Sequence, residues 1–416
     1  MRKTTALAML CYITALVGCG GTPPASSSLA AASGEQAGAP SWSDRAVTSY
    51  LEGDMDAAWR ASQNALQLNP LDDHGMEVAA RVALSRLDAR ATVAVLERAH
   101  GPTLLRLRAR ANAMLGEFAA VARDLGAVDG QEPVDGWATA MLPLSRAATA
   151  GPYFSATGDA SAEIPYQGAA ATLPIPIVAI TIDGRATNAL IATSASTTVV
   201  DDDGHPSGSV IADIGLGALH VHNVPSFARD LSDIENAVHI PIGAVIGMDI
   251  LLHLHATLDG PNRKLIVRTA APEIANDSLA LPFAMFQGSL LAIRATINDG
   301  QPQYYALDSA AGLVLALADV AVQSMHVDPA TLPLVPGSPV ANARVVDIES
   351  FHLGAAAIEH VPGVTGLVPP GLVEVAGTRI YGVIGGQFLA QFQMTFDTES
   401  NAVALRIDNS ATADAE

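Results

Sequence analysis

The sequence predicts an N-terminal α-helical repeat array followed by an all-β body made of two similar halves. Between residues 44 and 149, apolar and small residues follow a helical period that turns interrupt at regular intervals. From about residue 165 to 407, short runs of Val, Ile, Leu and Ala alternate with Gly, Pro, Asn and Asp, as in strands and turns. Within this second part, three sequence blocks occur twice in the same order.

The composition fits globular domains and argues against nucleic acid as a partner. Half of the 416 residues are hydrophobic, and 42 acidic residues outnumber 22 basic ones, giving a formal charge of −20. Because phosphate contacts need a basic surface, this charge argues against nucleic acid and anionic lipid headgroups as partners. Both cysteines, Cys11 and Cys19, lie near the N-terminus, so the body has no disulfide or thiolate chemistry. No phosphate-cradling loop or dinucleotide motif is present, and no cofactor is predicted.

Residues 1–18 are typical of a secretory signal peptide. Two basic residues precede an apolar run at 6–17 that is too short to span a bilayer. The run closes as Leu16-Val17-Gly18-Cys19, which resembles the lipobox of bacterial lipoproteins. This resemblance implies cleavage before Cys19 and lipidation of that residue, whereas the alternative is an ordinary signal peptide with an incidental cysteine.

Residues 19–43 are rich in Gly, Ala, Ser and Pro and predict a lipidated, flexible tether. The expected location is therefore the bacterial cell envelope, with acyl chains at Cys19 as the membrane anchor. Gly20 after the cysteine favours the outer membrane facing the periplasm, by analogy with lipoprotein sorting.

Turn signals divide residues 44–149 into short helical hairpins. Gly53-Asp54 separates two helical runs, and Asn69-Pro70 ends the second. Leu87-Asp88 follows 34 residues after Gly53-Asp54, and Gly116-Glu117 marks a shorter third unit. The spacing resembles tetratricopeptide repeats, which implies a face for a protein partner. The alternative is a generic helical bundle. Residues 150–164 are predicted as a linker.

The β region contains one duplicated unit. Gly184 and Gly300 each precede a loop position by eight residues, and these matched positions are Ala192 and Asp308. Two further pairs of blocks follow in the same order: Val224-Pro225 with Val361-Pro362, and Val245-Ile246-Gly247 with Val383-Ile384-Gly385. Their larger offset locates an insertion in the second copy, near residues 325–341.

The order of these blocks resembles the aspartic peptidases of the retropepsin and pepsin class. Leu307-Asp308-Ser309-Ala310-Ala311 stands where that family has Asp-Thr/Ser-Gly-Ala, and Ile191-Ala192-Thr193-Ser194-Ala195 stands at the same place in the first copy. The resemblance implies a pepsin-like double barrel with halves at 165–270 and 271–410 and a tail at 411–416. It also implies, in each half, a strand pair that can form a flap.

The loop residues predict an incomplete catalytic site. The family's reaction needs two carboxylates that share one proton, and Ala192 supplies none opposite Asp308. The family's loop glycine is Ser194 in one copy and Ala310 in the other, where a β-carbon crowds the loop if φ is positive. We expect Asp308 to persist by accepting hydrogen bonds from Ser309, Thr193 or loop amides.

The sequence therefore predicts a non-catalytic, peptidase-like module whose cleft binds a peptide or protein segment as an added strand. The alternative is an active aspartic endopeptidase that uses Asp308.

Other candidate groups give weaker signals. The acidic run at 201–203 follows a predicted strand and is expected to form a solvated turn. His220-Val221-His222 and His253-Leu254-His255 each place two imidazoles on one face of a predicted strand, a spacing that zinc sites also use. Exposed strand faces explain these histidines better, and no metal is predicted. Ser194 and Ser309 have no base nearby in the sequence, which argues against a serine nucleophile.

Overall fold

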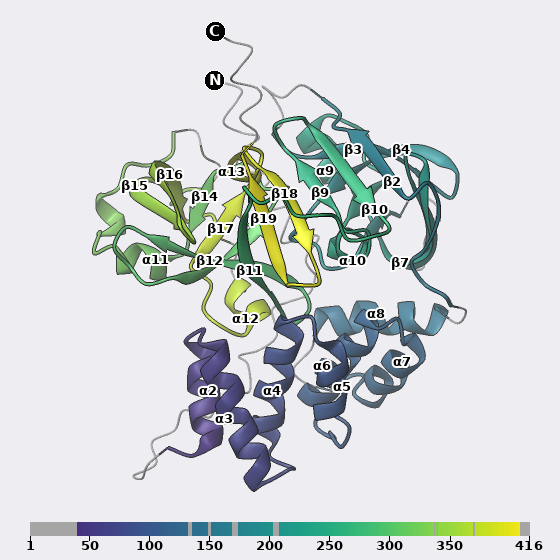
Figure 1. Cartoon of the computed structure of the whole chain (residues 1–416), viewed down its shortest axis with the longest axis vertical. Coiled ribbons are helices and arrows are strands. Elements are labelled where there is room, and N and C mark those ends of the chain that lie inside the picture. Colours follow the sequence, from purple (N-terminus) through teal and green to yellow (C-terminus); the bar gives the residue numbers. More distant parts are fainter. Residues whose placement is uncertain are drawn as a thin grey trace.

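The computed structural model describes residues 40–131, 135–148, 151–168, 174–202, 208–336, 338, 340–368 and 371–407. The predicted signal peptide 1–18, the lipidation site Cys19, nearly all of the tether and the tail 411–416 lie outside the described residues. The predicted fold class is confirmed, because N-terminal helices precede a pepsin-like double β-barrel. Figure 1 shows the helices as one layer along one side of the two barrels.

Seven helices form the N-terminal array within the described residues. They are α2 (Trp42–Leu51), α3 (Met55–Leu68), α4 (Asp73–Ser85), α5 (Ala89–Val95), α6 (Pro102–Met114), α7 (Phe118–Ala127) and α8 (Gly136–Ala147). The turns at 53–54, 87–88 and 116–117 separate α2 from α3, α4 from α5, and α6 from α7. Asp54 and Asp88 cap the helices that follow, each accepting a hydrogen bond from a first-turn amide.

The first half forms a seven-stranded barrel. Its strands are β1 (Ser155–Gly158), β3 (Ile177–Ile182), β4 (Arg185–Ile191), β5 (Val199–Asp201), β6 (Ser209–Leu216), β7 (Leu219–Arg229) and β8 (Ala244–Ile246). Their order is β1-β7-β5-β8-β4-β3-β6, and pairing between β6 and β7 closes the barrel. Helices α9 (Ser232–Val238) and α10 (Met248–His253) flank β8 in the chain.

The second half repeats this arrangement. Its strands are β12 (Leu290–Ile297), β13 (Gln303–Asp308), β14 (Leu315–Leu317), β15 (Arg344–Leu353), β16 (Ala356–Thr365) and β17 (Gly382–Gly385). The short helices are α11 (Asp319–Ser324), η2 (Pro329–Thr331), α12 (Leu372–Ala376) and α13 (Gly386–Leu389). In both halves, the strand of the repeated Val-Ile-Gly block lies between the two strands that flank the Ala192 or Asp308 loop. In the first half β8 lies between β4 and β5, and in the second half β17 lies between β13 and β14.

A six-stranded layer joins the halves. It contains β2 (Ser161–Pro165), β9 (Thr257–Asp259), β10 (Lys264–Arg268), β11 (Leu279–Phe286), β18 (Gln393–Asp397) and β19 (Ala402–Arg406), in the order β11-β19-β18-β9-β10-β2. At its centre Thr257 pairs with Thr395, and their hydroxyl oxygens are 2.9 Å apart. Since these threonines hold the same place in the two copies, the layer is built around an approximate twofold axis.

The predicted linker at 150–164 is wrong for much of its length. Residues 155–158 form β1, which pairs with β7, and Ser161–Pro165 form β2, which pairs with β10. Ala162 and Ile164 are buried while their neighbours in β2 are exposed, so the stretch alternates as a half-buried strand does. The segment thus enters the sheets instead of merely connecting domains.

The long hairpins of the two halves pair with strands of their own barrels. The β6–β7 hairpin pairs with β3 through Thr181 and Gly215, and the β15–β16 hairpin pairs with β12 through Thr296 and His352. At the tip of the β6–β7 hairpin, the Ala218 carbonyl accepts a hydrogen bond from the Asp159 amide. Each hairpin therefore completes the wall of its own barrel.

The helical array is fixed to the barrels by buried polar contacts. Tyr50 of α2 donates a hydrogen bond from its hydroxyl to the Ala376 carbonyl, and Thr378 donates to the Tyr50 carbonyl at 2.8 Å. Arg110 of α6 donates to the Ser289 hydroxyl, also at 2.8 Å. In the part of the chain that the structure describes, no helix combines the length and apolar character needed to cross a bilayer.

Candidate functional site

The candidate site consists of two loops, 192–198 and 309–314, which we call the paired loops. The first connects β4 to β5, and the second connects β13 to β14. Behind each loop lies a glycine from the end of β8 or β17, namely Gly247 or Gly385. A β-carbon at Gly247 would lie 2.7 Å from the Ala195 carbonyl oxygen, which is too close for any other residue type. The repeated Val-Ile-Gly block therefore lets its strand end pack directly against the loop.

Four hydrogen bonds join the paired loops reciprocally. The Thr193 hydroxyl donates to the Leu307 carbonyl at 2.9 Å, and the Ser309 hydroxyl donates to the Ile191 carbonyl at 2.8 Å. The Thr193 amide donates to the Ser309 hydroxyl oxygen, and the Ser309 amide donates to that of Thr193. Since Ile191 matches Leu307 and Thr193 matches Ser309, Ala192 and Asp308 occupy symmetry-related positions.

Asp308 is nearly enclosed at this junction. Its side-chain oxygen Oδ1 accepts hydrogen bonds at 3.0 Å from the Ser194 hydroxyl and from the Ala310 amide. Only 2% of Asp308 and 2% of Ala192 are exposed. The hydroxyls of Thr193 and Ser309 donate instead to backbone carbonyls across the junction, so the predicted donors to Asp308 are replaced by Ser194, with Ala310 as the loop amide.

The replaced loop glycines do not strain the backbone. Neither Ser194 nor Ala310 is among the residues with a positive φ, so both β-carbons are accommodated in ordinary conformations. The expectation of crowding at these positions therefore does not apply. The loops keep their reciprocal pairing without the family's glycine.

The helical array covers the paired loops. Ala192, Ala195 and Ala310 belong to one continuous apolar cluster with Phe118 of α7 and Trp137, Met141 and Leu144 of α8. Ala311 and Leu313 of the second loop belong to a second cluster with Tyr50 of α2 and Val78 and Val82 of α4. Helix α8 also contacts β6 and β7. Packed helices thus lie where access to Asp308 would be needed.

Asp249 is a half-buried carboxylate that was not predicted from the sequence. It follows Gly247 at the start of α10 and accepts hydrogen bonds from the Thr198 amide at 2.7 Å and the Thr198 hydroxyl at 2.8 Å. Burial raises the pKa of Asp249 to about 6, although the hydrogen bonds from Thr198 and Ile250 oppose the shift. The signal was a mismatch between copies, since Gln387 stands at the equivalent place.

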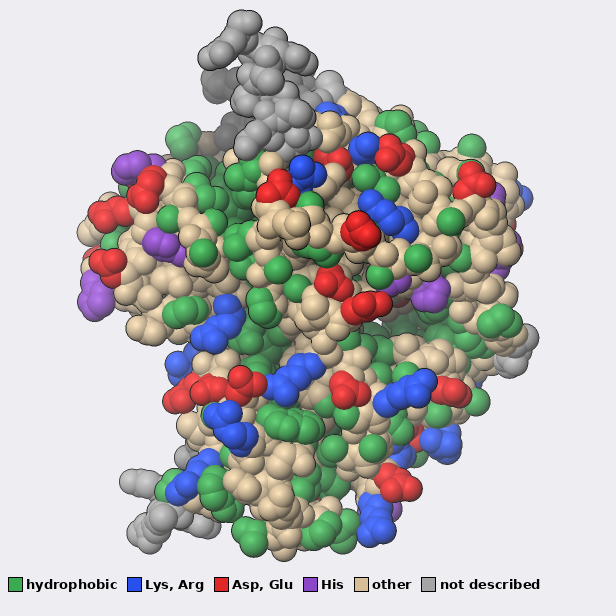
Figure 2. Space-filling model, in the orientation of Figure 1, with side chains coloured by type: hydrophobic (Ala, Val, Ile, Leu, Met, Phe, Trp, Pro, Cys, Tyr) green, Lys and Arg blue, Asp and Glu red, His purple; other side chains and the backbone are tan. Residues whose placement is uncertain are grey.

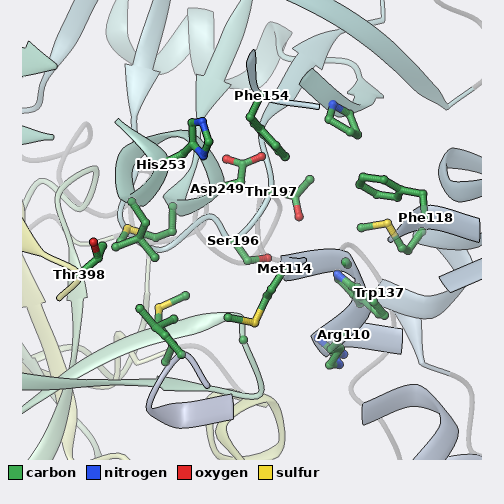
Figure 3. Close-up of a pocket in the computed structure, with 18 residues that line it drawn as sticks. Arg110, Met114, Phe118, Trp137, Phe154, Ser196, Thr197, Asp249, His253 and Thr398 are labelled. Atoms are coloured by element: carbon green, nitrogen blue, oxygen red, sulfur yellow. The ribbon is translucent and has the colours of Figure 1, made fainter. Parts of the chain in front are cut away.

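A cavity of about 310 Å³ lies beside the first loop. Ser196, Thr197 and Asp249 contribute from the first barrel, the helices contribute from the opposite side, and Met285, Gly288 and Thr398 contribute from the second half. Figure 3 shows Asp249 beside His253 and Phe154, across from Arg110, Trp137 and Phe118. Figure 2 shows the surface hollowed between the helices and a barrel.

The two histidine pairs belong to different elements of the first half, one to β7 and one to the end of α10. His222 accepts or donates at 2.7 Å with the Thr157 hydroxyl and lies 3.1 Å from an Asp213 carboxylate oxygen, on the outer face of the barrel. His253 ends α10, so its predicted place on a strand is wrong. Among the described residues, no group of three or more His, Cys, Asp or Glu is arranged to hold a metal ion.

The acidic run begins inside β5, because Asp201 is the last residue of that strand and pairs with Arg229, so the predicted solvated turn is wrong for Asp201. The Asp201 carboxylate accepts a hydrogen bond from the Leu231 amide at 3.1 Å, which fixes the start of α9. Asp202 follows it, and the third member of the run at 203 lies outside the described residues. Asp201 therefore has a structural partner of its own.

In chemical terms, the paired loops present one carboxylate, one methyl group and several hydroxyls. General acid–base attack by water on a peptide bond needs one carboxylate to accept a proton while a second donates one. Ala192 has no proton to exchange. The arrangement joins the two barrel halves through hydrogen bonds, with Ala192 at the position that matches Asp308.

Comparisons with known proteins found similarity only among solved structures, and it concerns the fold. No protein-family model matches the chain, and no curated protein matches it significantly. A retropepsin-like aspartic protease from Rickettsia conorii is 16% identical, with a TM-score of 0.25 over 33% of this chain and 94% of that one. An aspartic proteinase from Irpex lacteus is 13% identical, with a TM-score of 0.40 over 62% of this chain and 100% of that one.

Proposed function

We propose that this protein is a catalytically inactive, aspartic-peptidase-like lipoprotein of the bacterial cell envelope that binds polypeptide segments. The observation that carries the proposal is the reciprocal hydrogen bonding of the paired loops, which sets Ala192 opposite Asp308. Two carboxylates acting as a unit fail together when one is missing, commonly by several orders of magnitude in rate. Asp308 is then a vestige of the dyad with a structural role.

The cover over the paired loops supports the same conclusion. A substrate strand must reach the catalytic carboxylates, yet Asp308 is 2% exposed and the surrounding apolar clusters continue into α7, α8, α2 and α4. Binding of a polypeptide in the predicted cleft would require these helices to separate from the loops. We therefore assign binding to the open margin beside Ser196 and Thr197, where the cavity begins.

The competing function is an active aspartic endopeptidase that uses Asp308, and a peptidase assay separates the two. Purified protein is incubated with an unfolded, fluorescently labelled substrate protein at acidic and at neutral pH, beside the Asp308→Ala variant. We expect no cleavage by either protein, and slower tumbling of the labelled substrate when it is bound. Cleavage by the wild type that Asp308→Ala abolishes would overturn the proposal.

The envelope location rests on the N-terminal motif. Residues 1–18 as a signal peptide and Cys19 as the lipidated residue would leave the tether to hold the folded part away from the membrane. Metabolic labelling with a fatty acid tests this directly. We expect label in the wild type and none in Cys19→Ser, and equal labelling of both would refute the anchor.

A protein partner on the helical array is part of the same proposal. Leu68 and Leu71, at the end of α3 and just beyond it, are 77% and 57% exposed. Apolar side chains exposed this far beside a helical hairpin favour contact with another protein. The tetratricopeptide-like assignment of residues 44–149 would supply the binding face.

A further inference from the structure

The cavity between the helices and the barrels has the makeup of a small-ligand site. Its apolar wall is formed by methionines and aromatic residues from all three parts of the molecule. They are Met114, Phe118, Trp137, Met141, Phe154, Met248 and Met285. Methionine side chains are polarisable and adapt to different ligand shapes, and aromatic faces attract cations. A volume of about 310 Å³ lies within the range of ligand pockets.

The ionisable side chains that line the cavity differ in whether a neighbouring group compensates their charge. Arg110 is already neutralised, because it lies 3.1 Å from the Asp135 carboxylate and stacks 4.3 Å over the Trp137 ring. Burial lowers the pKa of His253, so its imidazole is uncharged near neutral pH. Asp249 receives its hydrogen bonds from Thr198 and the Ile250 amide, none of which carries a charge. Among the described lining residues, Asp249 therefore supplies the uncompensated charge.

We propose that this cavity binds an organic ammonium ion on an apolar chain, with the cation near Asp249 and the chain among the methionines and aromatic rings. In a site partly shielded from water, the attraction between opposite charges is stronger than at an exposed surface. A neutral ligand of the same shape gains the apolar contacts alone. The inference rests in part on the proposed function and deepens it, since the cavity opens at the margin beside Ser196 and Thr197 to which polypeptide binding is assigned.

Calorimetric titration of the purified full chain tests the charge. The probes are hexylamine and its neutral match 1-hexanol at pH 7.5. We expect hexylamine to bind at least about tenfold more tightly. The ratio should fall at pH 5, because Asp249 gains a proton through its pKa of about 6, while burial keeps the pKa of His253 below its usual value and Arg110 stays paired. Equal affinity for both probes, or no binding of hexylamine, would overturn the proposal.

Two matched variants test the place of binding. Met114 and Leu115 end the same helix and are 39% and 38% exposed, but Met114 lines the cavity and Leu115 does not. Met114→Trp should fill the cavity and abolish hexylamine binding, whereas Leu115→Trp should leave it unchanged. Equal loss in both variants would contradict the assignment. Asp249→Asn should remove the preference for hexylamine while hexanol binding persists.

A third titration separates the two sources of such a cation. A blocked tripeptide with a central lysine is compared with hexylamine, and the same peptide with norleucine serves as its neutral match. Tighter binding of the lysine peptide assigns the cavity to polypeptide side chains, and tighter binding of hexylamine assigns it to free amines. Failure of all cationic probes would refute the cavity site and leave the peptidase assay of Asp308→Ala unaffected.

Discussion

At the scale of single residues, the junction between Thr193 and Ser309 holds the paired loops together without any charged group. Each hydroxyl accepts a hydrogen bond from one backbone amide of the other half and donates one to a backbone carbonyl there. Two side chains therefore satisfy two buried amides and two buried carbonyls. Asp308 adds bonds to Ser194 and Ala310. The side chain of Ala192 takes no part in these bonds, so the network is complete without an acid at that position.

Restoring the second acid should destabilise the protein in a pH-dependent way. Ala192→Asp would place a second carboxyl opposite Asp308 in a site where both positions are 2% exposed. Two carboxylates this close cannot both ionise, so the pKa of one rises and stability is lost as pH increases through it. We expect a cost about 3 kcal/mol larger at pH 7.5 than at pH 5, measured by denaturant unfolding.

Ala192→Asn is the control for that variant. It adds nearly the same volume without a charge, so its cost should be the same at both pH values. If the Asp and Asn variants lose equal stability at pH 5 and at pH 7.5, the two loop positions do not face each other closely enough to share a proton.

Asp249 should act on stability in the same direction. Its pKa is raised from 3.8 to about 6, so the folded state holds a proton that the unfolded state has released between these values. The wild type therefore gains up to about 3 kcal/mol from this group as pH falls from 7 to 4, and Asp249→Asn does not. The stability lost in Asp249→Asn should grow between pH 7 and pH 5, and a constant difference would contradict the raised pKa.

At the scale of elements, local signals predicted more of the fold than long-range pairing did. The turns between helices at 53–54 and 87–88 could be predicted from the residues in them. Gly53 is followed directly by Asp54 at the first turn, and Asp88 caps the next helix at the second. β1 and β2 were missed because they are short and pair with distant strands, as Ala162 does with Val267. A strand of four or five residues carries little periodicity of its own.

The candidate site, too, could be predicted from the sequence only where its features are local. The duplication placed Ala192 opposite Asp308, because matched spacing around two glycines is a property of the sequence. The cover over the loops depends on the faces that α7 and α8 present after docking, and apolar residues such as Phe118 look the same in a core and in an interface. Asp249 could have been found by comparing Gly247-Met248-Asp249 with Gly385-Gly386-Gln387, where one copy keeps an acid.

At the scale of the whole molecule, buried contacts join the helices to the barrels. Glu77 and Arg81 of α4 form an ion pair at 2.7 Å with side chains only 5% exposed, close to the 377–378 segment of the second half. Separation of the array would expose these groups together with the apolar clusters around Ala192 and Leu313. The cost of such exposure opposes unfolding of either part alone.

Tryptophan fluorescence can test this coupling, because all three tryptophans, Trp42, Trp59 and Trp137, lie in the helical array. Phe396 lies in β18, in the core of the barrels, and is fully buried. Phe396→Ala should cost about 3–5 kcal/mol. If the molecule unfolds as one unit, the fluorescence midpoint in denaturant shifts with the far-UV circular dichroism midpoint, while Glu399→Ala on the exposed turn of the same hairpin shifts neither. A fluorescence transition that stays in place while the dichroism transition moves would show that the array unfolds independently, and Asp308 would then be open to substrate whenever the helices separate.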